Sequence, residues 1–134
     1  MKTLLVSAVA LIDQDGRVLL AQRPKGKSMA GLWEFPGGKM EDGETFDETI
    51  IREFKEELDI DIYPFHEFRT LTDANIKFIP IVVRLKGGKA KLIEHDEIKF
   101  VNKKEFFKMD LTKLSKGAGR ILFDSYFIFL KTED

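Results

Sequence analysis

The chain has 134 residues, of which 43% are hydrophobic and 34% charged, with 22 Lys and Arg against 23 Asp and Glu. This balance is typical of a folded domain and argues against a disordered chain or a protein that tracks nucleic acid with a basic stripe. The absence of cysteine excludes disulfides, thiolate metal sites and cysteine nucleophiles.

Length predicts one domain over residues 1–134. The apolar run at residues 4–12 is followed by turn residues instead of the cleavage site of a signal peptide. No apolar run approaches the roughly 20 residues of a membrane span. We therefore expect a cytoplasmic protein that has neither a membrane nor a nucleic-acid polymer as partner.

The N-terminal third predicts short β elements. Residues 4–12 and 18–23 are β-rich runs separated by an Asp-Gly pair ending at Gly16, which predicts a hairpin. Residues 24–31, rich in glycine and lysine, predict a loop. Residues 32–35 predict a short strand that stops at a Pro-Gly-Gly turn.

Residues 45–58 predict the most distinct helix of the chain. Thr45 and Glu48 have the spacing of a capping box, which satisfies N–H groups of the first turn. Apolar residues follow with helical periodicity and predict one stripe facing the core. These residues are Phe46, Ile50, Ile51, Phe54 and Leu58.

The second half alternates between strand and helix patterns. Strands are predicted over residues 60–72 and 76–85, with weaker candidates at 91–93 and 98–102, and helices over 103–108 and 121–130. The mixture of elements and the short connections predict an α/β (α+β) fold with a mixed sheet.

The predicted helix carries three acids on one flank. At about 100° per residue, Glu53 and Glu57 lie one turn apart with Glu56 beside them, and Glu44 precedes the helix. Like charges this close repel, and a hard divalent cation such as Mg²⁺ relieves the repulsion. The alternative from the acids alone is a solvated helix face with salt bridges.

Two neighbouring features fit a phosphate or metal site. Arg52 has the spacing to pair with Glu56 or with Glu48, and so to hold a carboxylate in place. Gly37 and Gly38 allow a tight turn and a close approach of the backbone to phosphate oxygens.

The stretch from Gly38 to Ile60 resembles the Nudix box, G-x5-E-x7-R-E-U-x-E-E-x-G-U, where U is a bulky aliphatic residue. The matching positions are Gly38, Glu44, Arg52, Glu53, Glu56, Glu57 and Ile60. Phe54 stands at an aliphatic position. Asp59 replaces the glycine after the helix, which predicts a cost of about 1 kcal/mol in local stability without touching the metal ligands.

The resemblance implies a Nudix-type α/β/α sandwich in which the box helix packs on the mixed sheet. It implies a Mg²⁺ cofactor, with Mn²⁺ as substitute, held by Glu53, Glu56 and Glu57 together with Gly38. The resemblance also implies that Glu44 assists catalysis and that Arg52 orients a catalytic glutamate. Glu53 or a loop carboxylate would orient or deprotonate the attacking water.

The run from Gly31 to Lys39 also resembles the MutT-like branch, whose members hydrolyse nucleoside triphosphates to the monophosphate and pyrophosphate. The substrate-binding candidates are Arg23, Glu34, Gly37, Gly38, Lys39 and Phe78. Glu97, with Glu94 behind it, is the candidate for a further metal ligand or base. The alternatives are a core phenylalanine at 78 and a solvated loop at 94–97.

The expected activity is therefore Mg²⁺-dependent hydrolysis of a (deoxy)nucleoside triphosphate, including oxidised nucleotides as one option, by a monomer or homodimer. The alternatives are another nucleoside diphosphate derivative (ADP-ribose, a dinucleoside polyphosphate or an RNA cap) or a nucleotide-binding domain without catalysis. Residues 114–120 show no counterpart of the Asn or Asp that usually reads the base. The base therefore stays open.

Overall fold

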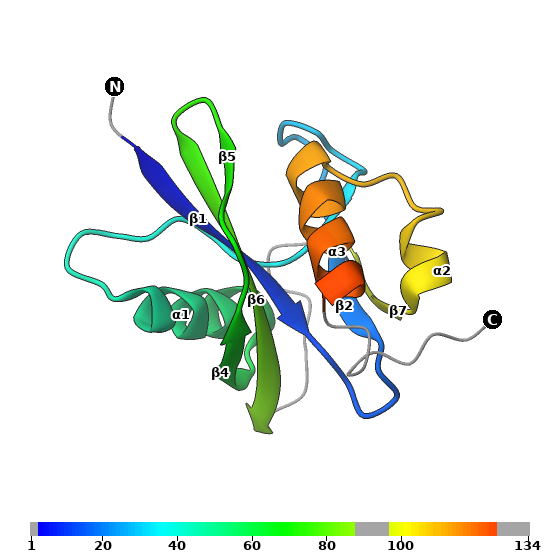
Figure 1. The fold of residues 1–134 in the computed structure, drawn as a ribbon, viewed down its shortest axis with the longest axis horizontal. Helices are drawn as coiled ribbons and strands as arrows, with labels where there is room; N and C mark the ends of the chain where they lie inside the picture. The colour runs from blue at the N-terminus through cyan, green and yellow to red at the C-terminus, as the bar shows by residue number, and fades with distance from the viewer. Residues whose placement is uncertain (1–2, 88–96, 126–134) are drawn as a thin grey trace.

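The computed structural model describes residues 3–87 and 97–125. The strands are β1 (Leu4–Leu11), β2 (Val18–Gln22), β3 (Trp33–Glu34), β4 (Asp61–Glu67), β5 (Leu71–Asp73), β6 (Ile76–Gly87) and β7 (Glu97–Val101). The helices are α1 (Phe46–Leu58), α2 (Lys103–Phe106) and α3 (Lys113–Ser125) (Figure 1). Within these ranges no helix is long and apolar enough to cross a membrane. The predicted strand 91–93 and Glu94 lie outside the described residues.

Two sheets form the centre of the molecule. In the four-stranded mixed sheet, β6 pairs in parallel with β1 and antiparallel with β4 and β5. In the second sheet, β2 pairs antiparallel with β3 and β7. The mixed sheet expected from the sequence is confirmed.

The two predicted N-terminal strands and the turn between them are confirmed, but the strands pair with each other only next to the turn. The turn forms, with Gly16 at φ 78°, but β1 and β2 belong to different sheets and share only the bridge between Ile12 and Val18. Successive residues of β1 from Ser7 onward are buried. Both strands are buried, and each pairs with a strand that is distant in the sequence: β1 with β6, and β2 with β7.

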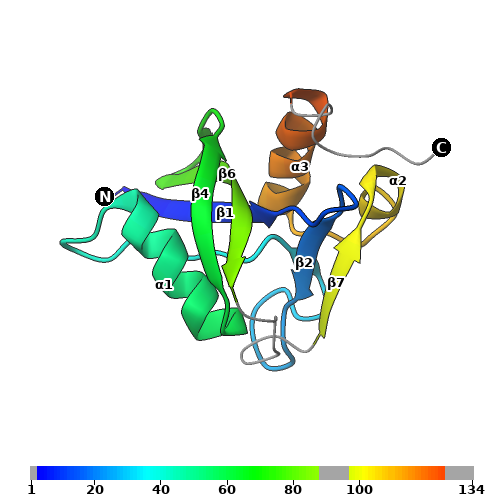
Figure 2. The same cartoon turned by 90° about the horizontal axis from the view of Figure 1, so that it is seen from below.

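Helices cover both faces of the mixed sheet, which confirms the α/β/α arrangement (Figure 2). On one face α1 buries Ile50, Phe54 and Leu58 against Val9 and Val83. On the other face a second core lies among the mixed sheet, the second sheet, α2 and α3. Its members include Ala10, Leu20, Val82, Phe106 and Leu122. The acid-bearing flank of α1 is therefore held in place by the apolar stripe beside it.

The ends of α1 form as the sequence predicts. The Thr45 side chain accepts from the Glu48 N–H, and Glu48 accepts from the Thr45 N–H, so the capping box is complete. Asp59 takes the left-handed conformation at φ 55° and ends the helix. Ile51 is exposed, so its predicted place in the core stripe is wrong.

Two element boundaries in the structure differ from those predicted from the sequence. The single strand expected over 60–72 is split into β4 and β5, which pair with different parts of β6. The last helix begins at Lys113 instead of residue 121, and Thr112 precedes it with a side chain that accepts from the Ser115 N–H. Glycines inside this helix lower its intrinsic propensity. Gly119 is nevertheless required, because a Cβ there would collide with the Phe106 ring.

Candidate functional site

The Pro-Gly-Gly turn lies along the edge of β1. Ser7 binds it from both sides: the Ser7 N–H donates to the Gly38 carbonyl at 2.9 Å, and the Gly38 N–H donates to the Ser7 hydroxyl oxygen at 3.0 Å. Gly37 has φ 150°, and a Cβ there would collide with the Ser7 carbonyl. Glycine is therefore required for the turn to reach the sheet this closely.

The same turn touches the acidic flank of α1. A Cβ on Gly38 would collide with the Glu53 carboxylate. The backbone of the Gly37–Gly38 turn therefore packs directly against the Glu53 carboxylate of α1. The Gly38 carbonyl also lies 3.2 Å from the Ser7 hydroxyl oxygen, so both of its contacts go to Ser7. Its role as a metal ligand stays a prediction.

Arg52 connects the acids to one another. Its Nε and Nη2 donate to the two carboxylate oxygens of Glu44 at 2.6 and 2.9 Å. Its Nη1 lies 3.0 Å from Glu53 Oε1 and 3.2 Å from Glu56 Oε2. The predicted pairing with Glu56 is present, whereas Glu48 is occupied by the helix cap. One guanidinium therefore places three of the predicted acids.

These contacts move the pKa of both partners in the direction that keeps the pair charged. The hydrogen bonds from Arg52 and from the Glu41 N–H lower the pKa of Glu44 from 4.5 to about 2. The Glu44 hydrogen bond raises the pKa of Arg52, with Glu53 adding to the effect. Glu44 is thus an ionised anchor for Arg52, and its carboxylate oxygens are committed to that role.

Glu53 and Glu57 face a cavity of about 180 Å³, whose wall also includes Arg23, Glu34 and Gly37. Glu57 is only 4% exposed, and the Glu53 side chain 16%. Burial raises the pKa of Glu53, while the neighbouring Arg52 and a hydrogen bond with Glu57 oppose that rise. Glu56 differs, because its side chain is 53% exposed and does not line this cavity.

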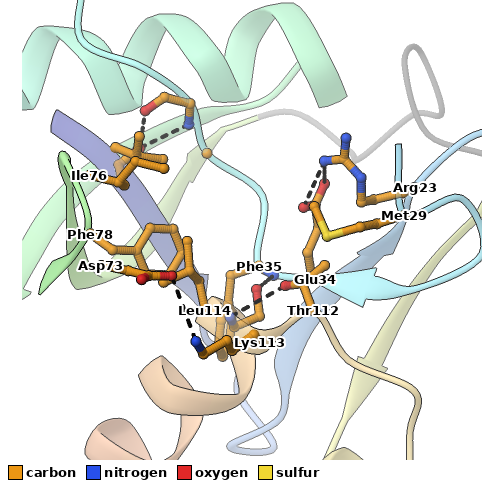
Figure 3. Close-up of a pocket in the computed structure, with 15 residues that line it drawn as sticks. Arg23, Met29, Glu34, Phe35, Asp73, Ile76, Phe78, Thr112, Lys113 and Leu114 are labelled. Atoms are coloured by element: carbon orange, nitrogen blue, oxygen red, sulfur yellow. Dashed lines mark hydrogen bonds and ion pairs between the residues drawn. The ribbon is translucent and has the colours of Figure 1, made fainter. Parts of the chain in front are cut away.

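Figure 3 shows a second cavity, of about 460 Å³. It adjoins the first cavity, because Arg23, Glu34 and Gly37 line both. Arg23 Nη1 lies 3.1 Å from Glu34 Oε1, and Arg23 Nε donates to the Ser28 carbonyl at 2.7 Å. Phe78 lines this cavity and is otherwise buried in the core. The core interpretation of Phe78 is confirmed, and its stacking on a base stays a prediction.

Two candidates lie apart from this arrangement. Lys39 is exposed and lines a third hollow with Met40 and Glu41, while its carbonyl accepts from Arg52. Glu97 is exposed at the start of β7, opposite Gln22, and lines none of these three cavities. Their roles in phosphate and metal binding stay predictions.

The structure adds lining residues that the sequence did not indicate. They come from the loop after β2, from β5 and from the start of α3: Met29, Asp73, Thr112, Lys113, Leu114 and Ser115. Leu114 and Ser115 belong to the stretch 114–120, where the sequence shows no Asn or Asp to read the base, and Lys113 was missed because the helix was predicted to start later.

The comparisons with known proteins agree with this geometry. The family model of the NUDIX domain matches residues 1–123. The chain therefore belongs to the NUDIX domain family, and the MutT-like resemblance seen in the sequence is confirmed by its relatives.

Two of these relatives are enzymes by name. The chain is 46% identical over 61 residues to the 8-oxo-dGTP diphosphatase of Proteus vulgaris, a segment that covers 46% of this chain and 54% of that protein. It is 52% identical over 52 residues to the CTP pyrophosphohydrolase of Escherichia coli K12, covering 39% of this chain and 38% of that protein. The matching segments thus span about half of these relatives or less.

A solved structure extends the likeness over the fold. The solution structure of the E. coli ORF135 protein superposes with a TM-score of 0.76 at 26% identity, covering 92% of this chain and 91% of that one. Identity is thus 46% and 52% over the two matched segments and 26% over the superposed fold.

Nudix hydrolases generally use divalent metal ions, and the acids present here have the chemistry to hold one. Glu57 is buried, Glu53 is half-buried, and the two carboxylates are in contact with each other, which places two hard oxygen donors at one cavity. Within residues 3–87 and 97–125, no three acidic or histidine side chains already converge as a ligand set. Glu56 is instead held by Arg52.

Proposed function

We propose that this protein is a Mg²⁺-dependent hydrolase that cleaves a nucleoside or deoxynucleoside 5′-triphosphate to the monophosphate and pyrophosphate. Mn²⁺ is the expected substitute, and oxidised nucleotides are included among the substrates. The names of the relatives, an 8-oxo-dGTP diphosphatase and a CTP pyrophosphohydrolase, support this class of reaction.

The observation that carries the proposal is the adjacency of two unlike cavities. The smaller contains Glu53 and Glu57, and the larger has an apolar wall that includes Phe78. They share Arg23, so a nucleotide lying across both would place its phosphates between Arg23 and the glutamates. Its base would then lie in the larger cavity, where aromatic and aliphatic side chains favour a flat ring.

Glu53, Glu56 and Glu57 would hold the metal, which when bound neutralises phosphate charge and lowers the pKa of water. Arg52 positions Glu53 and Glu56 through its Nη1 nitrogen. Glu53 lies at the smaller cavity beside Glu57, where it would orient the attacking water and accept its proton. The water oxygen bonds to phosphorus, and the electron pair of the broken anhydride bond leaves with pyrophosphate.

Several assignments belong to the same proposal. Glu97 serves as a further ligand or base, and Lys39 supplies positive charge near the phosphates. The partner is a small nucleotide, the protein acts in the cytoplasm as a monomer or homodimer, and no nucleic-acid polymer is required.

The proposal is tested by turnover on a panel of normal and oxidised nucleoside triphosphates, with ADP-ribose and a dinucleoside polyphosphate as the competing substrates. Products are resolved as monophosphate, pyrophosphate or phosphate. We expect monophosphate and pyrophosphate from triphosphates. Preferential cleavage of ADP-ribose, or release of single phosphates, would overturn the assignment.

Glu57→Gln tests the site itself. Removing the charge of a buried ligand should lower turnover about hundredfold with little change in the circular dichroism spectrum. Asp47→Asn is the matched control, because Asp47 is an exposed acid on the same helix outside all three cavities. Equal rates in the two variants would contradict the proposal.

A further inference from the structure

The larger cavity has an ion pair at each end. Arg23 and Glu34 lie at the end shared with the acidic cavity, and Asp73 and Lys113 lie on the opposite side (Figure 3). Between the two pairs the wall is largely apolar and includes Phe35, Phe78 and Leu114. A ligand in this cavity therefore meets charge at its two ends and hydrocarbon along its length.

This layout fixes the direction of a nucleotide. If the phosphates lie toward Arg23 and the glutamates, as the proposed function requires, the far edge of the base faces Asp73 and Lys113. The base ring then lies among the apolar side chains, where its hydrogen-bonding edge would otherwise have few partners.

Asp73 and Lys113 are available for such an edge. Their closest charged atoms are 3.8 Å apart, and their side chains are 51% and 87% exposed. An exposed pair at this distance contributes little to stability, so separating the two groups costs little. They also come from different elements, because Asp73 ends β5 and Lys113 begins α3. The cavity therefore presents one anionic acceptor and one cationic donor side by side.

We propose that Asp73 and Lys113 determine base specificity and select guanine, in its normal or 8-oxo form. Among the four common bases only guanine has a carbonyl oxygen next to two adjacent N–H donors on one edge. A carboxylate accepts both N–H groups in parallel, as it does from the arginine fork, while an ammonium faces the carbonyl oxygen. Oxidation at C8 leaves this edge unchanged, so both forms of guanine satisfy it.

The other bases match less well. Adenine offers an amino group beside a ring nitrogen, and cytosine an amino group beside two acceptors, so neither gives a carboxylate two parallel donors. Uracil and thymine place one N–H between two carbonyl oxygens. Each would leave part of the carboxylate without its hydrogen bonds, which is the usual origin of strong discrimination.

The test compares Asp73→Asn and Lys113→Met with the wild-type protein. The kcat/KM values for dGTP, 8-oxo-dGTP, dATP, dCTP and dTTP are measured with Mg²⁺. We expect each variant to lose on the order of tenfold on both guanine substrates and much less on the other three. Because dGTP and 8-oxo-dGTP present the same hydrogen-bonding edge, kcat/KM should fall by the same factor for both.

Two exposed residues outside the cavity serve as controls. Lys116→Met removes a lysine from the same helix, and Glu67→Gln removes an acid from β4, and neither residue lines the cavity. Both should retain the wild-type order of substrates. A loss that is equal on all five substrates, or no change in either cavity variant, would overturn the proposal.

A binding measurement separates this inference from the proposed function. Calorimetric titration of dGMP and dCMP without metal reports base recognition alone. Wild-type preference for dGMP that disappears in Asp73→Asn supports the inference even if no triphosphate is hydrolysed, in which case only the proposed activity fails. A preference that is unchanged in both variants refutes the inference even if triphosphates are cleaved.

Discussion

Arg52 and Glu44 form a two-point contact, with Nε and Nη2 of the guanidinium at 2.6 and 2.9 Å from the two carboxylate oxygens. Glu44 precedes α1 and Arg52 lies inside it, so the contact ties the loop to the helix. The remaining nitrogen of the same group reaches Glu53 and Glu56. Only a planar guanidinium, with its N–H groups at fixed angles, can donate to carboxylates in several directions at once.

Arg52→Lys should therefore impair the site although the charge is kept. An ammonium cannot form both bonds to Glu44 and still reach the helix acids, so we expect turnover to fall about 10- to 100-fold with a smaller change in melting temperature. Steady-state kinetics and thermal melts in Mg²⁺ check both.

Lys55→Met is the matched control for that substitution. Lys55 is on the same helix but pairs with Asp59 and Asp61 at its C-terminal end. Its loss should leave kcat near the wild-type value. If Arg52→Lys also keeps kcat near the wild-type value, the guanidinium contacts of Arg52 have no part in catalysis.

Acid should weaken the fold through Glu44. Its pKa is lowered from 4.5 in the unfolded chain to about 2 in the folded protein, so its contribution to stability is complete above about pH 4.5 and is lost as the pH falls toward 2. Urea unfolding across this range should show a decline in the free energy of unfolding. In Glu44→Gln the decline should be shallower, and an identical slope in both proteins would disprove the assignment.

Gly38→Ala should disturb the site through a single methyl group. The new Cβ would collide with the Glu53 carboxylate, which is the end of a flexible side chain and can move aside. We therefore expect a destabilisation of only about 1 kcal/mol, but a clear loss of turnover because Glu53 is displaced. Gly87→Ala is the control, because the nearest atom to a Cβ there is Asp61 Oδ2 at 4.0 Å. The free energy of unfolding, from chemical denaturation, and kcat should both be lower in Gly38→Ala than in Gly87→Ala. Equal values in the two variants would argue against the close approach of Gly38 to Glu53.

Two glycines of α3 should respond in opposite directions. At Gly119 a Cβ would collide with the Phe106 ring, and the overpacking cost of about 1–3 kcal/mol outweighs the gain of about 1 kcal/mol in helix propensity. At Gly117 the nearest atom is the mobile Leu71 Cδ1 at 3.2 Å, so alanine should be neutral or stabilising. Phe106→Leu should partly rescue Gly119→Ala. Equal effects at both positions would show that packing against α2 is not the cause.

Local features of the chain could be predicted well where the interactions themselves are local. The cap at Thr45, the left-handed Asp59 and the flank of acids on α1 depend on residues a few positions apart, and each appears in the structure as expected. Ile51 shows the limit of that approach, because its exposure depends on how far the sheet extends beneath the helix.

The sequence by itself determined the family, the acidic helix and the glycine turn, since spacing along one helix and one loop specifies them. Tertiary structure decided which strand pairs with β1, where α3 begins, and that Asp73 meets Lys113 at one end of a cavity. These relationships join residues far apart in the chain. Their free energy comes from burial and close packing between elements, such as Gly119 against Phe106, which no local pattern encodes.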